Sequence, residues 1–466
     1  MKRVVQFALM LALLFVFVAC SNNSGNTDTT SNSGNTDNTN NTDNTDNSDN
    51  DNNNENEPDP DPVTIRLHHW YNEEQDNWHE VIAAFEEEFP HIKVESVTPE
   101  NNNADETMQQ IDLAAASGDQ LDVIMVNSPQ GYSQRVAQGM FAPLDEYINT
   151  AGITYDNDYR VDTKIDGHYY ALPGKFNMNF VMINEDALNE AGLEIPKDWT
   201  WDEYMDYAAA LTKGEGQNKQ YGTFFHTWND YIRLAVFNQP ENSSFVKDDG
   251  VTSNVDSPLF RQSLEIRERG HEEGSATPYA DTISMSLNYR PEYFSGRAAM
   301  IMTGSWMIAE AGGRPDEESE FTTAFAPYPK ANDGDDIYTP AGADFLTVYS
   351  GSDYKEEAFE FIRWYTTEGI VMQGKYLPDY LGADMDVVLE NLLESTYGDK
   401  VNVDSLIHVL DVTLAQNLHI PVPFFNEVAT AYQNEVEKFL LDEQDLDTTL
   451  EKAHEGVQKV IDENVN

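Results

Sequence analysis

The apolar residues 298–302 are followed closely by Gly304-Ser305-Trp306, and this tryptophan is a candidate ligand-binding residue. The apolar run is typical of a buried strand, and the glycine after it can leave the tryptophan at the mouth of a site. An indole in that place offers an aromatic face to a ligand. A lone tryptophan is, however, more often an ordinary core residue. These residues by themselves leave both interpretations open.

Motifs for covalent or metal chemistry are scarce in this sequence. It contains no Gly-x-Ser-x-Gly, no complete phosphate-binding Gly-x-x-x-x-Gly-Lys-Ser/Thr, since Lys375 in the match at 369–375 is followed by Tyr376, and no cysteine nucleophile. His68 and His69 are adjacent, so they face opposite ways on an extended segment, and no other histidine lies at ligand spacing. Carboxylate pairs could serve a glycosidase, but with 83 acidic residues their closeness in sequence says almost nothing. We therefore expect no catalytic residues, no metal and no cofactor.

The elements that position a site are clearest between residues 63 and 126. Apolar spacing predicts strands at 63–67, around Ile92 and at 121–126, with helices before Pro90 and before Gly118. This order indicates a parallel α/β sheet, whose ligands lie beyond the carboxyl ends of the strands. The candidate ligand-binding residues from this rule are Trp70 and Tyr71 after the first strand, and Asn127 and Ser128 after the third.

The first 20 residues have the features of an export signal. Lys2 and Arg3 precede an apolar run that ends at Cys20, the only cysteine. Residues 17–20 resemble a bacterial lipoprotein box, which implies that Cys20 becomes lipidated after cleavage. Residues 21–62 have no large apolar side chain, so they are expected to form a disordered stalk rich in Asn, Asp and Thr. Calcium binding by the stalk is an alternative, but its repetitive spacing lacks the features of a dedicated loop.

The composition sets further limits on function. The chain has 27 basic and 83 acidic residues, and its formal net charge is −56. Such a negative net charge excludes nucleic acid as a natural partner, because the two would repel each other. It indicates a solvated acidic surface suited to a saline or an alkaline exterior. The roughly 400 residues after the stalk are enough for two lobes with separate cores.

Several motifs follow one another in a characteristic order along the rest of the chain. They are Tyr169-Tyr170-Ala171-Leu172-Pro173, Asn179-Phe180-Val181-Met182-Ile183-Asn184, Trp199-Thr200-Trp201-Asp202-Glu203, Phe294-Ser295-Gly296-Arg297, Gly304-Ser305-Trp306, Ala324-Phe325-Ala326-Pro327 and Gly342-Ala343-Asp344. Together they resemble the extracellular solute-binding proteins of ATP-binding-cassette (ABC) sugar importers, the group that includes the maltose-binding proteins. The resemblance runs from residue 63 to about residue 460.

This resemblance implies an α/β, two-lobed, periplasmic-binding-protein-like fold of type II. Each lobe would be a mainly parallel sheet flanked by helices, with a hinge and an inter-lobe cleft. The expected parts are the signal peptide 1–20, the stalk 21–62, an N-terminal lobe of 63–173 plus 343–378, and a C-terminal lobe of 174–342 plus 379–466. The first crossing between the lobes is expected near residues 172–174.

The resemblance also implies a function. The chain would capture a sugar or oligosaccharide by hinge closure and deliver it to the permease subunits of the importer, without enzymatic activity. It would be a monomer, tethered by its lipid to the extracellular face of the cytoplasmic membrane. The alternatives are a cell-surface glycosidase, the same fold with a non-sugar solute, and a structural adhesin.

The residues expected to line the cleft come from both lobes. The resemblance places Trp306 on the cleft wall as a stacking platform, and the further candidates are Trp70, Tyr71, Asn127, Ser128, Trp228, Gly342 and Asp344. Many relatives have Gly-Gly where this chain has Gly342 with alanine on either side, and position 183 is given no ligand role. The remaining tryptophans, Trp199, Trp201 and Trp364, are expected to pack in the core.

Overall fold

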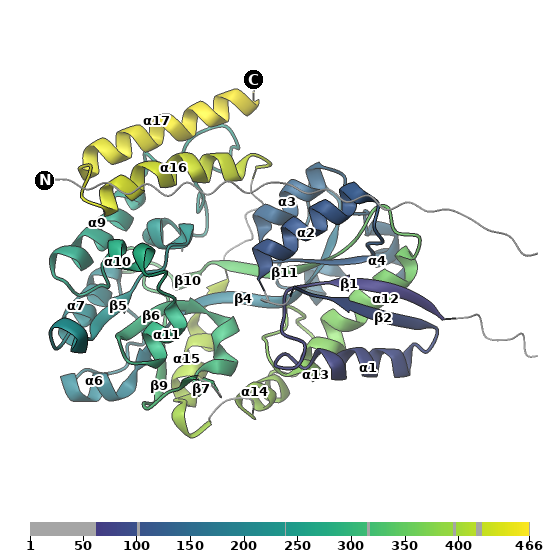
Figure 1. Cartoon of the computed structure of the whole chain (residues 1–466), viewed down its shortest axis with the longest axis horizontal. Coiled ribbons are helices and arrows are strands. Elements are labelled where there is room, and N and C mark those ends of the chain that lie inside the picture. Colours follow the sequence, from purple (N-terminus) through teal and green to yellow (C-terminus); the bar gives the residue numbers. More distant parts are fainter. Residues whose placement is uncertain are drawn as a thin grey trace, which may run out of the picture. The chain divides into compact units, whose positions relative to one another are not determined.

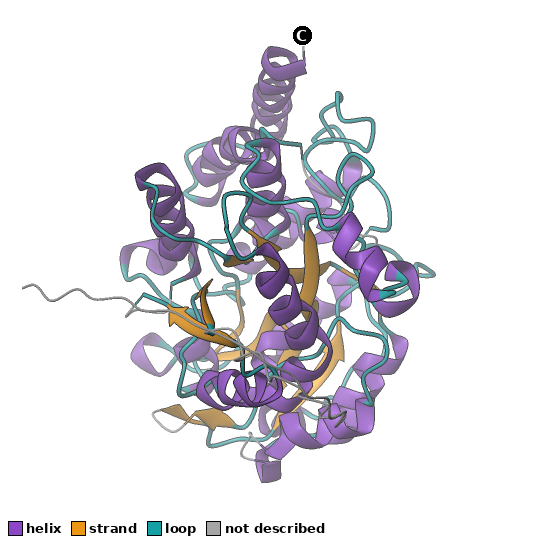
Figure 2. Cartoon of the chain, turned by 90° about the vertical axis from the view of Figure 1, so that its right-hand side faces the viewer, coloured by secondary structure: helices purple, strands orange, loops and turns teal. Residues whose placement is uncertain are grey.

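The computed structural model describes residues 62–99, 103–237, 239–314, 317–394, 398–415 and 422–465. The predicted signal peptide with Cys20, and the predicted stalk as far as residue 61, lie outside the described residues. The chain from Asp59 to Asn466 forms one compact unit. An eight-stranded sheet runs through this unit, and helices cover it on both faces (Figures 1 and 2).

The strands of the sheet follow the order β2-β1-β3-β11-β4-β6-β5, with β9 paired to β4 beside this path. Their bounds are β1 Val63–His68, β2 Ile92–Val97, β3 Val123–Val126, β4 Ala171–Asn184, β5 Tyr221–Phe224, β6 Ala298–Gly304, β9 Thr323–Pro327 and β11 Ala341–Val348. Two further pairs of short strands are β7 Gly313–Arg314 with β8 Glu317–Glu318, and β10 Tyr338–Thr339 with β12 Leu414–Ala415.

The α-helices are distributed along the whole chain. Their bounds are α1 Trp78–Glu88, α2 Ala104–Ser117, α3 Pro129–Ala137, α4 Asp145–Ala151, α5 Tyr155–Asp158, α6 Glu185–Ala191, α7 Trp201–Leu211, α8 Leu234–Phe237, α9 Pro258–Glu272, α10 Tyr279–Ser284, α11 Tyr289–Phe294, α12 Lys355–Trp364, α13 Ile370–Gln373, α14 Met385–Glu394, α15 Val403–Val412, α16 Phe425–Leu440 and α17 Leu446–Val465. Short 3-10 turns include η2 (Asn229–Ile232) and η3 (Ser305–Glu310), and a π-helical turn spans Tyr365–Gly369.

The elements predicted between residues 63 and 126 are confirmed. Strands β1, β2 and β3 pair in parallel, with Ile65 opposite Val94 and Leu67 opposite Val123. Helix α1 buries one apolar stripe against them, and α2 ends at Gly118, whose φ of 77° is easily adopted only by a residue without a side chain. The local pattern of apolar residues is therefore sufficient to predict the elements of this part of the chain.

The centre of the sheet is antiparallel, which the sequence does not reveal. Strand β11 lies between β3 and β4 and runs antiparallel to both. Strand β4 is unusually long: residues 171–178 pair with β11, and residues 179–184 pair with β6 and β9. The α/β fold class is confirmed, with parallel pairs at β2-β1-β3 and at β5-β6 and with antiparallel pairs where β4 and β11 join them.

The hydrophobic core is divided into clusters on either side of this centre. Two clusters take their residues from 65–172 and 345–376, and the others take theirs mainly from positions after residue 175. Trp199, Trp201 and Trp364 are buried, as predicted. The lobe boundaries at 173, 342 and 378 stay a prediction.

A buried carboxyl group lies where three segments meet beside the middle of β4. Asp379 N–H donates to the carbonyl of Gly174 at 2.8 Å, and Asp379 Oδ1 accepts from the backbone N–H groups of Arg160 and Val161 at 2.9 and 3.1 Å. Among the described residues nothing donates to Asp379 Oδ2, although it is buried. Burial raises the pKa of Asp379 to about 7.

The raised pKa of Asp379 predicts how this residue makes the free energy of unfolding depend on pH. The unfolded chain releases the Asp379 proton near the ordinary aspartate pKa of 3.8, while the folded protein keeps it up to about pH 7. The contribution of Asp379 to the free energy of unfolding therefore falls as pH rises from about 4 to 7, and it levels off above 7. Asp379→Asn removes this loss, so urea unfolding should show the variant gaining about 2–4 kcal/mol over wild type between about pH 4.5 and pH 8.

The exposed carboxylate Glu390 provides the control for this measurement. Glu390→Gln should change the free energy of unfolding by less than about 0.5 kcal/mol at either pH. An Asp379→Asn variant whose stability tracks wild type at both pH values would contradict the assignment of a protonated Asp379.

Candidate functional site

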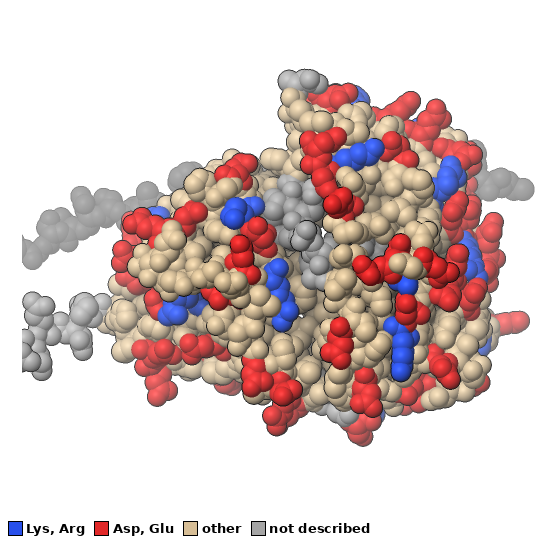
Figure 3. Space-filling model, turned by 180° about the vertical axis from the view of Figure 1, so that it is seen from behind, with Lys and Arg blue, Asp and Glu red and all other residues tan. Residues whose placement is uncertain are grey.

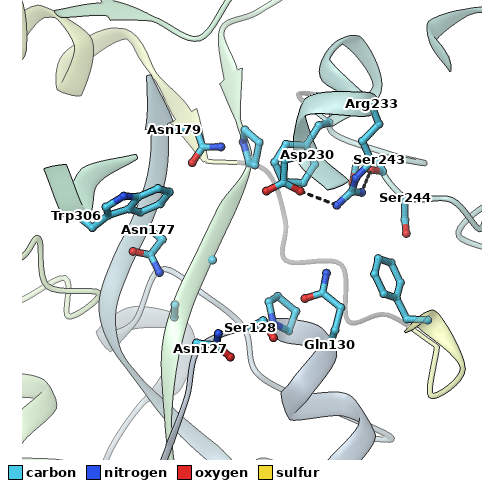
Figure 4. A pocket seen from close by; sticks show the side chains of 16 residues that line it. Asn127, Ser128, Gln130, Asn177, Asn179, Asp230, Arg233, Ser243, Ser244 and Trp306 are labelled. Atoms are coloured by element: carbon cyan, nitrogen blue, oxygen red, sulfur yellow. Dashed lines mark hydrogen bonds and ion pairs between the residues drawn. The ribbon is translucent and has the colours of Figure 1, made fainter. Parts of the chain in front are cut away.

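A polar cavity of about 250 Å³ opens beside the middle of the sheet. Its walls come from segments far apart in the sequence: the start of α3, strands β4 and β11, turn η3, and the region of η2 and α8 (Figure 4). The residues that line it are Asn127, Ser128, Pro129, Gln130, Asn177, Asn179, Asp230, Arg233, Phe237, Ser243, Ser244, Trp306, Pro340, Gly342, Ala343 and Phe425.

The alternation of side chains along β4 places two amides in this cavity. Asn177 and Asn179 point to the cavity, whereas Phe176 and Met178, the intervening residues, pack into the core. The amide nitrogen of Asn177 donates to Asp344 Oδ1 at 3.4 Å, and its oxygen has no partner among the described residues although it is buried. This oxygen is therefore ready to accept a hydrogen bond from a ligand.

Below the amides, a buried ion pair holds the floor of the cavity. Lys175 Nζ on β4 lies 3.1 Å from Asp344 Oδ2 on β11, and both side chains are almost fully buried. The hydroxyl of Tyr71 donates to the same Asp344 oxygen, and the Tyr71 ring stacks on Tyr376 at 5.2 Å. Burial, with the Asp344 charge next, raises the pKa of Tyr71 well above 10. Asp344 thus has protein partners on both carboxylate oxygens.

Trp306 forms one wall of the cavity, and Gly304 determines where its ring lies. A Cβ built on Gly304 would approach the Trp306 ring to 2.1 Å, so the indole occupies the space that any other side chain would need. The indole N–H donates to Tyr289 Oη at 3.2 Å, and Arg290 donates to the same oxygen at 2.5 Å. Trp228, 41% exposed, lies edge-on to Trp306 with 6.4 Å between centroids.

The opposite wall carries a pair of charged side chains. Arg233 Nη2 donates to Asp230 Oδ1 at 3.0 Å, and Arg233 Nη1 donates to the carbonyl of Ser243 at 3.1 Å (Figure 4). Burial raises the pKa of Asp230, while the Arg233 charge opposes this rise. Arg233 Nε and Ser244 Oγ are both buried, and neither has a partner among the described residues. This wall therefore offers unused donors beside a carboxylate.

The structure brings together four of the eight residues that the sequence singled out. Asn127, Ser128, Trp306 and Gly342 line the cavity. Trp228 lies beside it through its contact with Trp306.

The other three predicted residues do not line the cavity. Asp344 and Tyr71 are buried beneath it, and Trp70 is half-buried, with its ring 5.2 Å from that of Tyr71.

Several lining residues were missed by the sequence analysis. Asn177 and Asn179 could have been found from their alternation with apolar residues in the long strand. Asp230 follows two residues after the candidate Trp228, but nothing in the sequence links it to Arg233 or to Ser243 and Ser244.

His69, the second residue of the histidine pair, has protein partners on its imidazole ring. Both ring nitrogens of His69 are engaged, by Ser96 Oγ at 2.7 Å and by Tyr71 N–H at 3.1 Å, and burial lowers its pKa to about 3. No group of three or more potential metal ligands occurs among the described residues, and no described helix is long and apolar enough to cross a bilayer. Acidic side chains are spread over the face seen in Figure 3, with fewer basic ones between them.

Residues 71–372 match the family model described as bacterial extracellular solute-binding protein. The match covers more than half of the chain. This protein belongs to the bacterial extracellular solute-binding proteins. The family resemblance inferred from the sequence motifs is therefore confirmed.

Individual relatives are distant. The maltotriose-binding protein of Pyrococcus abyssi is 24% identical over 50% of this chain and 48% of its own length. The arabinooligosaccharide-binding protein of Halalkalibacterium halodurans is 21% identical over 62% of this chain and 64% of its own length. The matches thus span about half to two thirds of these curated relatives.

Among solved structures, an ABC substrate-binding protein of Listeria monocytogenes in complex with cycloalternan is similar. Its TM-score is 0.71 at 21% identity, over 86% of this chain and 99% of that one. At this identity the likeness shows the shared fold.

The buried Lys175–Asp344 pair generates a prediction about stability. Lys175→Met leaves the Asp344 carboxylate buried without its counter-charge, so the free energy of unfolding in urea should fall by about 3–5 kcal/mol. Adding Asp344→Asn to Lys175→Met removes the stranded charge and should recover a large part of the loss. The exposed pair Lys213–Glu190 is the control, and Lys213→Met should cost less than about 1 kcal/mol. Equal losses for Lys175→Met and Lys213→Met would refute a structural role for the buried pair.

Proposed function

We propose that this protein is the substrate-binding lipoprotein of an ABC importer and that it captures a neutral sugar or oligosaccharide in the cavity beside Trp306. The observation that carries the proposal is an aromatic face in a cavity whose lining includes three atoms without a partner among the described residues: the Asn177 amide oxygen, Ser244 Oγ and Arg233 Nε. Sugars need this combination, because their C–H faces are apolar while each hydroxyl both donates and accepts. The names of the maltotriose- and arabinooligosaccharide-binding relatives support the same ligand class.

The charges of the cavity favour a neutral ligand over an anionic one. Arg233 is neutralised by Asp230, so the wall carries no net charge. The chain's formal charge of −56 also opposes the approach of phosphate or uronate groups. A polyol phosphate would need several unpaired cations, and Arg233 is the single basic residue among those that line the cavity.

Each candidate residue receives a role in this proposal. Trp306 stacks on one sugar ring, and the exposed Trp228 extends the platform beyond the cavity. Asn127 and Ser128 bind hydroxyls from the α3 side, and Gly342 leaves room for the ligand above β11.

The predicted site residues that do not line the cavity either position a lining residue or contact the ligand only after the lobes close. Asp344 and Tyr71 orient Asn177 rather than touching the ligand, because their oxygens bond to each other below the cavity. Trp70 reaches the ligand only after closure of the lobes.

The origin of the cavity walls supports a hinge closure. Asn127, Ser128 and Gln130 belong to the part of the chain around β3, whereas Asp230 and Trp306 belong to the part around β6. A ligand that touches both walls stabilises the closed state by the difference between its affinities for the two states. The closed complex is then delivered to the permease subunits, without covalent chemistry.

A glycosidase is the rival from another class, and the cavity gives it little support. Glycoside hydrolysis uses two carboxyl groups about 5–10 Å apart. Asp230 is the single acidic residue among those that line the cavity, and it is paired with Arg233. Incubation with a panel of neutral oligosaccharides tests the proposal directly: at least one should bind and raise the melting temperature, and all should be recovered intact.

The stacking role of Trp306 is tested by truncation. Trp306→Ala should weaken binding of the best sugar of the panel by about 1–3 kcal/mol, which is about fivefold to more than a hundredfold in Kd, measured by calorimetry. The buried Trp199 provides the contrast: Trp199→Ala should cost about 3–5 kcal/mol of folding stability and leave the affinity of the folded protein unchanged. A Trp306→Ala variant with normal affinity and a large loss of stability would make Trp306 a packing residue.

The lipid anchor is tested at Cys20, which lies outside the described residues. Cys20→Ser should release the protein from the membrane fraction, because the acylated cysteine is the proposed attachment. The sugar affinity of the released protein should equal that of wild type. Retention of Cys20→Ser in the membrane would instead indicate that residues 4–19 hold the chain there.

A further inference from the structure

A second cavity, of about 520 Å³, lies outside the proposed sugar site and shares no lining residue with it. It is enclosed by the C-terminal half of α9, the segment leading into α10, and the end of α16. Phe225, Tyr279, Phe439 and Leu440 give it apolar walls. None of the roles proposed above uses this cavity.

The inner wall of this cavity contains a buried cation without a counter-charge. Arg267 is 6% exposed, and no described carboxylate lies within ion-pair distance of it. Arg267 Nη1 donates to the carbonyl of Tyr231 at 2.7 Å, and the guanidinium lies 4.8 Å from the centroid of the Phe225 ring. Burial lowers its pKa to about 10, so it stays charged at neutral pH. An isolated buried charge is costly, and a ligand anion would supply the missing partner.

A second unused donor lines the same cavity. Thr277 Oγ1 is buried and has no partner among the described residues. Arginine has no acceptor, and a threonine hydroxyl can donate, so the two side chains together suit a group with two acceptor oxygens. A carboxylate has this form.

The outer residues of the cavity carry the opposite charge. Glu268 and Glu272 lie one helical turn apart on α9, and Asp442 lies next to them with His271 as its partner at 3.4 Å. Burial, together with the charge of Glu272, raises the pKa of Glu268. These carboxylates, and the chain's charge of −56, oppose a simple anion and attract a cationic group.

We infer that this cavity is a second ligand site that binds a small zwitterion, with its carboxylate at Arg267 and Thr277 and its ammonium group toward Glu268 and Glu272. The apolar walls then contact the carbon chain between the two charges. Each charge of the ligand meets its opposite, which neither a plain anion nor a plain cation achieves. The inference is independent of the sugar site.

The test uses the purified chain and three matched probes: 4-aminobutyrate, butyrate and butylamine. In calorimetric titration 4-aminobutyrate should bind saturably and raise the melting temperature, and butyrate and butylamine should bind at least tenfold more weakly. Butyrate or butylamine binding as tightly as the zwitterion, or no binding by any probe, would overturn the inference.

Two variants locate the binding in this cavity. Arg267→Gln should lower the affinity for 4-aminobutyrate at least tenfold, but it also loses a bond to the Tyr231 carbonyl and the variant can fail to fold. Thr277→Val therefore carries the test: it replaces a hydroxyl that has no partner among the described residues by a methyl group of similar size, so the fold is kept. It should weaken binding about fivefold. Unchanged affinity in Thr277→Val would overturn the placement of the carboxylate.

The acidic residues at the outer side of the cavity are tested separately. Glu268→Gln should weaken binding of 4-aminobutyrate and strengthen that of butyrate, because the outer side of the cavity becomes less negative. A change in the same direction for both probes would contradict the proposed orientation. Sugar affinity, measured in parallel, reports on the other cavity, so failure of either proposal is recognised on its own.

Discussion

The ion pair between Lys175 and Asp344 constrains the whole region around the proposed sugar site. It joins β4 to β11 where the two strands cross the centre of the sheet, and its burial means that neither partner can be left alone at low cost. Tyr71 adds a third segment to this junction. As a result, the amides above the pair lie on a rigid floor, and a ligand meets groups that are already positioned rather than groups that it must order.

The part of the fold that the sequence predicts well is the part built from local patterns. Strands β1 to β3 and helices α1 and α2 follow from apolar spacing and from stop residues such as Gly118. The insertion of β11 between β3 and β4 does not follow, because it pairs residues far apart in the sequence and no local preference encodes such a partner. Only the order of motifs, read as a family resemblance, indicated the complete architecture.

The proposed sugar site divides in the same way. Trp306, Asn127 and Ser128 are recognisable because each follows a strand whose end can be located in the sequence. Asp230 and Arg233 are not, because their position depends on a 3-10 turn and on the carbonyl of Ser243 in the following loop. For Asp344, a carboxylate beside a glycine suggests ligand contact, whereas the structure shows it bound to Lys175 and Tyr71, so its contact with a ligand stays a prediction.

The placement of β11 also determines the order in which the chain can fold. Strands β3 and β4 are complete once residue 184 has been synthesised, but the strand that belongs between them ends at residue 348. Until then both strands have unpaired edges, which are prone to aggregation. A fragment that stops before residue 341 lacks the strand that joins β3 to β4, so it cannot form the described sheet. A chain emerging N-terminus first must be kept from premature association until β11 arrives, and such non-local pairing makes folding slow.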